Sequence, residues 1–150
     1  MARYKLSENG EITMSKYCVI GAGPAGLASM KTLVDAGLEF DCFERTQLVG
    51  GHWNTDYEAL HLITSSKVTG YDGHPMPEDW PIFPSRKLML QYFEDFAQEF
   101  DLKKYVTFGV SVDRVDPVPT DGPIGSAGWS VTTSDGKTNS YDGVFVSNGH

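Results

Sequence analysis

The stretch Lys16–Gly37 decides the fold, and its centre is the loop Gly21-Ala22-Gly23-Pro24-Ala25-Gly26. The apolar run Tyr17–Ile20 enters the loop and is typical of a buried parallel strand. Beyond the loop, apolar residues recur at helical spacing, at Leu27, Met30, Leu33 and Val34. A strand, a tight glycine turn and a helix in this order predict a dinucleotide-binding β-α-β unit.

Each conspicuous residue of the loop has its own physical role. Gly21 permits the sharp turn out of the strand, and Gly23 lets a pyrophosphate approach the backbone without meeting a Cβ. Gly26 lets the helix pack closely, and Pro24 suits the first helical position because its missing N–H is not needed there. Gly37 falls where a helix C-cap is expected. The start of such a helix attracts an anion through its free N–H groups and its dipole.

The second part of the dinucleotide-binding motif is an acidic residue after the next strand. Phe40–Phe43 is the predicted strand, and Glu44 follows Gly21 by about the 20 residues expected for a ribose-binding carboxylate. A carboxylate there repels a 2′-phosphate, so FAD or NAD is favoured over NADP. The alternative is a β-α-β unit that binds nothing, with Glu44 an ordinary solvated charge.

Composition narrows the class of protein. The chain has 150 residues, 40% of them apolar and 21% charged, as in a globular domain. The net charge of −8 without a basic cluster argues against nucleic acid or an anionic membrane as a partner, and we expect no membrane segment. Cys18 and Cys42 fall in predicted strands without metal-binding spacing, so we expect reduced core thiols in a cytoplasmic protein and no metal site.

Two short segments after Glu44 are candidates for ligand contact. Gly50-Gly51-His52-Trp53 brings bare backbone and an indole together. Trp53 alone is equally a core aromatic, but the preceding glycines favour ligand contact. Thr64-Ser65-Ser66 offers three adjacent hydroxyls, which either bind a ligand or make a hydroxyl-rich turn. Residues 70–84 are rich in glycine and proline and predict a loop, held to the body by its aromatics Tyr71, Trp80 and Phe83.

The second half of the chain predicts one helix and then strands. Ser85 caps an ordinary packing helix over Arg86–Phe100, and a short strand is expected near Val106. Three β-rich runs separated by turns at Asp121-Gly122-Pro123 and Asp135-Gly136 predict an antiparallel meander: Val110–Val115, Trp129–Thr133 and Tyr141–Ser147. The last run also has the character of a buried strand. Residues 1–15 are polar and weakly patterned, and we expect a leader outside a domain that spans 16–150.

As a set, these motifs resemble the flavin-containing monooxygenases. The resemblance runs from about Lys16 to His150 and rests on Gly21–Gly26, Glu44-Arg45, Gly50–Trp53, Thr64–Lys67, Pro75–Pro77, Phe83–Ser85 and Ser147–His150. It implies an α/β, Rossmann-like FAD-binding domain of the flavoproteins with two dinucleotide-binding domains. In that fold the parallel sheet and helices are joined by an antiparallel meander, and the last strand returns beside the first.

The resemblance also implies site residues. The loop would hold the FAD pyrophosphate, Glu44 the ribose, and Val112 the adenine through its backbone. Gly51, His52 and Trp53 would lie along the ribityl chain and isoalloxazine, with Thr64 and Ser65 near the reactive ring edge. The implied FAD-binding residues are Gly21, Ala22, Gly23, Pro24, Ala25, Gly26, Glu44, Arg45, Gly51, His52, Trp53, Thr64, Ser65 and Val112, and the one implied catalytic residue is Thr64.

The family reduces FAD with NADPH, forms a C4a-hydroperoxide with O₂ and passes one oxygen to a soft nitrogen or sulfur nucleophile or to a ketone. Many members have Asn where this chain has Thr64. The family's NADPH motif lies beyond the point that matches His150, so we expect a fragment or split-gene product, inactive without the rest of the enzyme. Two alternatives remain open, an NAD-dependent oxidoreductase domain and a non-catalytic dinucleotide-binding module.

Overall fold

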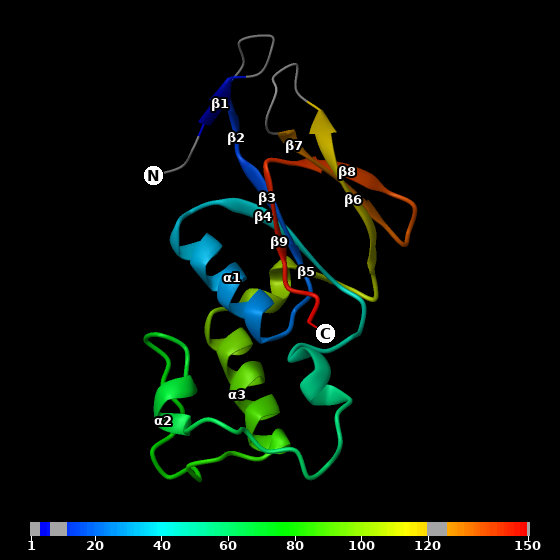
Figure 1. The fold of residues 1–150 in the computed structure, drawn as a ribbon. Helices are drawn as coiled ribbons and strands as arrows, with labels where there is room; N and C mark the ends of the chain where they lie inside the picture. Colours follow the sequence, from blue (N-terminus) through cyan, green and yellow to red (C-terminus); the bar gives the residue numbers. More distant parts are fainter. Residues whose placement is uncertain (1–3, 7–11, 120–125, 150) are drawn as a thin grey trace.

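A four-stranded parallel sheet forms the centre of the molecule in the computed structural model, which describes residues 4–6, 12–119 and 126–149 (Figure 1). Its strands are β3 (Lys16–Ile20), β4 (Glu39–Glu44), β5 (Val106–Phe108) and β9 (Gly143–Val146), in the order β5-β4-β3-β9. Since β3 pairs in parallel with both β4 and β9, the predicted buried parallel strand is confirmed.

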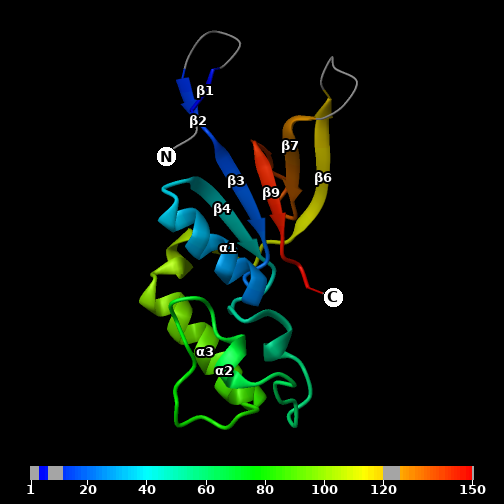
Figure 2. The ribbon, with the colours of Figure 1, turned by 60° about the vertical axis from the view of Figure 1, so that its left-hand side comes forward.

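Helices cover one face of this sheet, and the main core lies beneath them (Figure 2). The two long helices are α1 (Pro24–Asp35) and α3 (Arg86–Glu99), whose apolar stripes bury Leu27, Met30, Phe93 and Phe96. The Ser85 hydroxyl accepts from the Leu88 N–H, as predicted for the cap of α3. Among the described residues, no helix combines the length and apolar character needed to cross a membrane. The shorter helices are η1 (Gly51–Asn54), α2 (Ser66–Thr69) and η2 (Leu102–Tyr105).

An antiparallel meander covers the other face of the sheet. It consists of β6 (Val112–Pro119), β7 (Ser126–Thr133) and β8 (Thr138–Tyr141). A small second core beneath it contains Cys18, Val131 and Tyr141, whereas Cys42 belongs to the main core under the helices. Both cysteines are buried, as predicted. They do not form a disulfide with each other, because the two thiols lie on opposite faces of the sheet. Burial raises the pKa of the Cys42 thiol to about 12. The α/β, Rossmann-like architecture is therefore confirmed.

The prediction drawn from the β pattern of Tyr141–Ser147 was wrong in two respects, although the return of the last strand beside the first, which the family resemblance implied, is confirmed by the pairing of β9 with β3. The third meander strand is β8, which ends at Tyr141, and the residues after Asp142 leave the meander to form β9 in the parallel sheet. The second error is burial, because β9 is an edge strand whose Phe145 and Val146 side chains are 39% and 68% exposed.

In two further segments the structure adds to the predictions. Within residues 1–15, predicted to be a leader outside the domain, β1 (Tyr4–Leu6) pairs with β2 (Ile12–Met14) as an antiparallel hairpin. In the loop over 70–84, Tyr71 and Trp80 pack against the main core as predicted, but Phe83 is 51% exposed and does not anchor the loop. The predicted turn at Asp121-Gly122-Pro123 lies outside the described residues.

Candidate functional site

The glycine loop lies at the carboxyl end of the parallel sheet, between β3 and α1 (Figure 1). The Gly21 N–H donates to the Phe43 carbonyl at 2.8 Å, and the Ser147 N–H donates to the Ile20 carbonyl at 2.9 Å. The loop is thereby tied to the ends of β4 and β9. Open α/β sheets bind ligands in the crevice beyond the carboxyl ends of their strands, so the loop has the placement expected of a dinucleotide site.

Two of the loop glycines are required by the protein's own packing. Gly21 has a φ of +96°, and a Cβ there would lie 2.6 Å from the Ser147 carbonyl oxygen. A Cβ on Gly26 would lie 1.9 Å from the Gly21 carbonyl oxygen, far inside van der Waals contact. The turn and the close start of α1 therefore both depend on glycine, as the sequence predicted.

Gly23 is different, because nothing in the described chain requires a glycine there. Its φ of −74° is open to any residue. A Cβ built on it would meet Gly51 alone, at 3.5 Å from Cα and 3.8 Å from N, which is ordinary contact. Gly51 has a φ of +59° and faces Gly23 across this gap. A bare backbone that the fold itself does not need fits a ligand that lies directly against it.

Glu44 is buried beside the loop, with 6% of its surface exposed. Its Oε2 accepts from the Ala22 N–H at 2.8 Å, and its Oε1 accepts from the N–H and the hydroxyl of Thr46 at 2.8 and 2.9 Å. A carboxylate offers about four lone-pair positions. The three bonds fix the carboxylate at the end of β4 and leave room for one more donor, such as a ribose hydroxyl.

The first turn of α1 has a short set of donors for an anion. The Ala22 N–H is engaged by Glu44, and the Ala22 carbonyl accepts from the Gly50 N–H at 2.9 Å. Pro24 has no N–H, and the Leu27 N–H donates to the Gly23 carbonyl at 2.9 Å. Ala25 and Gly26 are thus the predicted loop residues whose first-turn N–H groups could bind an anion. Ala22 instead stabilises the loop through its bonds to Glu44 and Gly50.

The short helix η1, which follows β4, is anchored by side chains that pack in the main core. Trp53 is 9% exposed and packs near Phe93 in the main core, with its ring 6.1 Å from that phenyl group. The structure thus gives Trp53 the core position that was one of its two interpretations. His52 stacks on Trp53 at 5.5 Å, and its Nε2 lies 3.5 Å from Asp56 Oδ2.

Arg86 is a site residue that sequence analysis missed. Its Nη1 donates to the carbonyls of Trp53 and Asn54, at 3.1 and 3.0 Å, and so fixes the end of η1. A usable signal was present, because Arg86 is the first residue of α3 and a cation at a helix N-terminus opposes the helix dipole. A residue in an unfavourable local position indicates a tertiary partner.

The remaining predicted residues lie around the loop with less constraint. The Ser65 hydroxyl accepts from the Lys67 N–H and caps α2, and the exposed Thr64 hydroxyl bonds the Thr69 hydroxyl at 2.7 Å. The hydroxyls of Thr64 and Ser65 therefore bond within their own turn. Arg45 is exposed, and Val112 begins β6 two residues after Val110, whose N–H donates to the Glu44 carbonyl at 3.1 Å.

Replacing Glu44 with alanine is expected to lower the free energy of unfolding of the ligand-free chain by about 1.5–3 kcal/mol, the usual contribution of hydrogen bonds to a charged group. The reason is that the buried Ala22 N–H loses its acceptor. Urea unfolding measures the change. Glu39→Ala, on the same strand, is the control, because this exposed carboxylate lies 3.8 Å from Lys16 and should contribute less than about 1 kcal/mol. Equal losses in the two variants would contradict the buried role of Glu44.

Comparison with known proteins places these features in a family. The sequence model described as "Flavin-binding monooxygenase-like" matches residues 14–150. The dimethylaniline monooxygenase (N-oxide-forming) 2 of Cavia porcellus is 41% identical over 148 residues, covering 90% of this chain and 27% of that protein. Flavin-containing monooxygenase 2 of Homo sapiens is 40% identical over the same coverage. The chain therefore spans about a quarter of the length of these curated relatives.

Solved structures agree with this match. The S-allyl-L-cysteine S-oxygenase from Allium sativum is 28% identical, with a TM-score of 0.76 over 90% of this chain and 36% of that one. A steroid monooxygenase solved in its oxidized form with NADP bound is 26% identical, with a TM-score of 0.76 over 90% of this chain and 26% of its own. Both the sequence and the architecture show that this chain belongs to the flavin-binding monooxygenase-like family.

Proposed function

We propose that this chain is the FAD-binding part of an NADPH- and O₂-dependent monooxygenase. The observation that carries the proposal is the bare backbone of Gly23, which the fold does not require, opposite Gly51 and beside the buried carboxylate of Glu44. A dinucleotide pyrophosphate uses the first feature and a ribose uses the second.

Residues of the chain would share the binding of FAD. The N–H groups of Ala25 and Gly26 would donate to the pyrophosphate, and the remaining acceptor position of Glu44 would take a ribose hydroxyl. Val112 would meet the adenine at the start of β6. The segment from Gly51 to Trp53, Arg45, Thr64 and Ser65 would line the path from the ribose towards the flavin ring.

The bound flavin would supply the redox chemistry, taking electrons from NADPH and placing one oxygen atom of O₂ on the substrate. The chain's own contribution is binding and orientation, which the rigid contacts of Glu44 and Arg86 serve. We propose soft nitrogen or sulfur nucleophiles as substrates, or ketones. The relatives' names support this range, since they include a dimethylaniline N-oxide-forming enzyme and an S-allyl-L-cysteine S-oxygenase.

Competition binding tests the cofactor. The purified chain is titrated with FAD while tryptophan and flavin fluorescence are followed, and NAD and NADP are then added as competitors. We expect FAD to bind more tightly than NAD. We expect NADP to be the weakest competitor, because the Glu44 carboxylate repels a 2′-phosphate. Equal affinities for FAD and NAD would overturn the flavin assignment and favour an NAD-dependent domain. Failure of all three to bind would favour the alternative of a β-α-β unit that binds nothing.

A further inference from the structure

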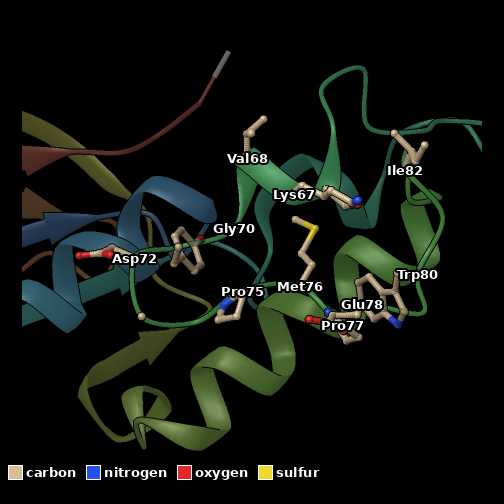
Figure 3. A pocket seen from close by; sticks show the side chains of 13 residues that line it. Lys67, Val68, Gly70, Asp72, Pro75, Met76, Pro77, Glu78, Trp80 and Ile82 are labelled. Atoms are coloured by element: carbon tan, nitrogen blue, oxygen red, sulfur yellow. The ribbon is translucent and has the colours of Figure 1, made fainter.

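Tyr71 reaches from the loop after α2 to the first residue of α1. Its hydroxyl donates to the Pro24 carbonyl at 2.7 Å, across 47 positions of sequence. The same residue lines an open groove of about 690 Å³, formed by residues 66–82 and lined also by Lys67, Met76 and Trp80 (Figure 3). None of the predicted cofactor-binding residues lines this groove. Tyr71 is therefore the side chain that joins the groove wall to the dinucleotide loop.

The position of Tyr71 is tightly determined. Its ring stacks on Tyr92 at 5.5 Å and lies 4.2 Å from the ring of Phe96. Its N–H donates to the Tyr92 hydroxyl at 2.6 Å. Burial raises the pKa of the Tyr71 phenol above its ordinary value, so the hydroxyl stays protonated and remains a donor. The bond to Pro24 is thus held by a ring that has little freedom to move.

The acceptor of this bond belongs to a functional peptide group. The Pro24 carbonyl and the Ala25 N–H are the two ends of one planar peptide unit. A donor on the carbonyl fixes the plane of that unit and polarises it, so the N–H at the other end becomes a better donor. Ala25 supplies one of the few N–H groups in the first turn of α1, since Pro24 has none and the Leu27 N–H is engaged by Gly23.

We propose that Tyr71 is a positioning residue for the bound dinucleotide: its hydroxyl orients and polarises the Pro24–Ala25 peptide group, whose N–H then donates to the pyrophosphate. This inference rests on the proposed binding of FAD and deepens it. It assigns a role at the cofactor site to a residue that sequence analysis gave only a packing role.

The chain contains a matched control in the same aromatic cluster. The Tyr92 hydroxyl also donates to a backbone carbonyl, that of His74, at 2.6 Å. The same hydroxyl accepts from the Tyr71 N–H, so it ties the loop to α3 through two bonds, and its bonds among the described residues go to that loop. Both Tyr71→Phe and Tyr92→Phe keep the ring, but Tyr92→Phe loses two hydrogen bonds whereas Tyr71→Phe loses one. A purely structural role therefore predicts an effect of Tyr92→Phe at least as large as that of Tyr71→Phe.

The test is the FAD dissociation constant of wild type, Tyr71→Phe and Tyr92→Phe, with urea unfolding of each flavin-free chain alongside. We expect Tyr71→Phe to weaken FAD binding by about fivefold to tenfold, the effect of one lost hydrogen bond, and Tyr92→Phe to change it by less than about twofold. The unfolding midpoint should fall at least as far in Tyr92→Phe, which loses two hydrogen bonds, as in Tyr71→Phe, which loses one. ADP, which also carries a pyrophosphate, should lose the same factor as FAD in Tyr71→Phe.

The outcomes separate the two levels of the proposal. Equal losses of FAD affinity in both variants, or no loss in Tyr71→Phe, would overturn the role of Tyr71. So would a loss for FAD without a loss for ADP, because the effect would then lie away from the pyrophosphate. Absence of FAD binding in wild type would instead overturn the proposed function. Should Tyr71→Phe be too unstable to titrate while Tyr92→Phe is stable, Tyr71 is a folding residue and the proposal fails.

Discussion

Gly23→Ala is expected to abolish most FAD binding while lowering the free energy of unfolding of the flavin-free chain by no more than about 1 kcal/mol, the cost of alanine at the N-cap of α1. The added Cβ meets only ordinary contact with Gly51, and the backbone at a φ of −74° accepts alanine without strain. A pyrophosphate lying against the same backbone would be displaced. Overpacking of this kind costs up to about 3 kcal/mol, which corresponds to about a 100-fold weaker affinity. Fluorescence titration with FAD and urea unfolding without it measure the two quantities.

Gly136→Ala is the complementary control. Gly136 has a φ of +81°, with open space around it among the described residues, and lies in the turn between β7 and β8. Alanine there should lower the free energy of unfolding by about 1 kcal/mol through backbone strain and should leave FAD affinity unchanged. If Gly23→Ala instead destabilised the flavin-free chain and kept its FAD affinity, the glycine would serve the fold and our reading of the site would be wrong.

Gly26→Ala is expected to lower the free energy of unfolding by about 3 kcal/mol or more, because the new Cβ would lie 1.9 Å from a backbone oxygen that has no freedom to move. Inside a helix, Gly→Ala ordinarily stabilises by up to about 1 kcal/mol, so the sign of the effect is diagnostic. Urea unfolding of the flavin-free chain measures it.

The control for Gly26→Ala is Ala28→Gly, two residues further along α1. This change records the propensity cost of glycine in the same helix, about 1 kcal/mol. A stabilising Gly26→Ala, or one with an effect no larger than that of Ala28→Gly, would mean that the start of α1 can relax away from Gly21.

The parts of the fold that could be predicted from sequence are those specified locally. A physical cause within a few residues exists for the apolar run before Gly21, for the positive φ of Gly21, for Gly26 against the Gly21 carbonyl and for Pro24 at the first helical position, whereas the described chain does not itself require Gly23. The positions of β3, α1 and β4 followed from them and were confirmed. Glu44 was predicted by its distance from the loop, and the structure places its carboxylate against Ala22.

The parts that could not be predicted depend on contacts between distant residues. Tyr141–Ser147 has one continuous β pattern, and only the pairing of Tyr141 with Trp129 and of Gly143 with Tyr17 divides it between two sheets. Arg86 stands at an unfavourable place for a cation, the start of α3, which indicated a tertiary partner, but nothing local identified that partner as η1. The FAD-binding roles of the individual residues stay predictions until they are measured.

The pairing of β3 with β9 also sets the order in which a growing chain can complete its sheet. Ile20 is aligned with Val146, and the Lys16 N–H donates to Asp142 across 126 positions. Contacts of such long sequence separation form slowly, because loop-closure entropy must be overcome before they stabilise anything. During synthesis β3 and β4 can pair early, but the edge of β3 stays open until β9 leaves the ribosome. For that interval the nascent chain presents an unpaired apolar strand edge, the kind of surface through which partly folded chains aggregate.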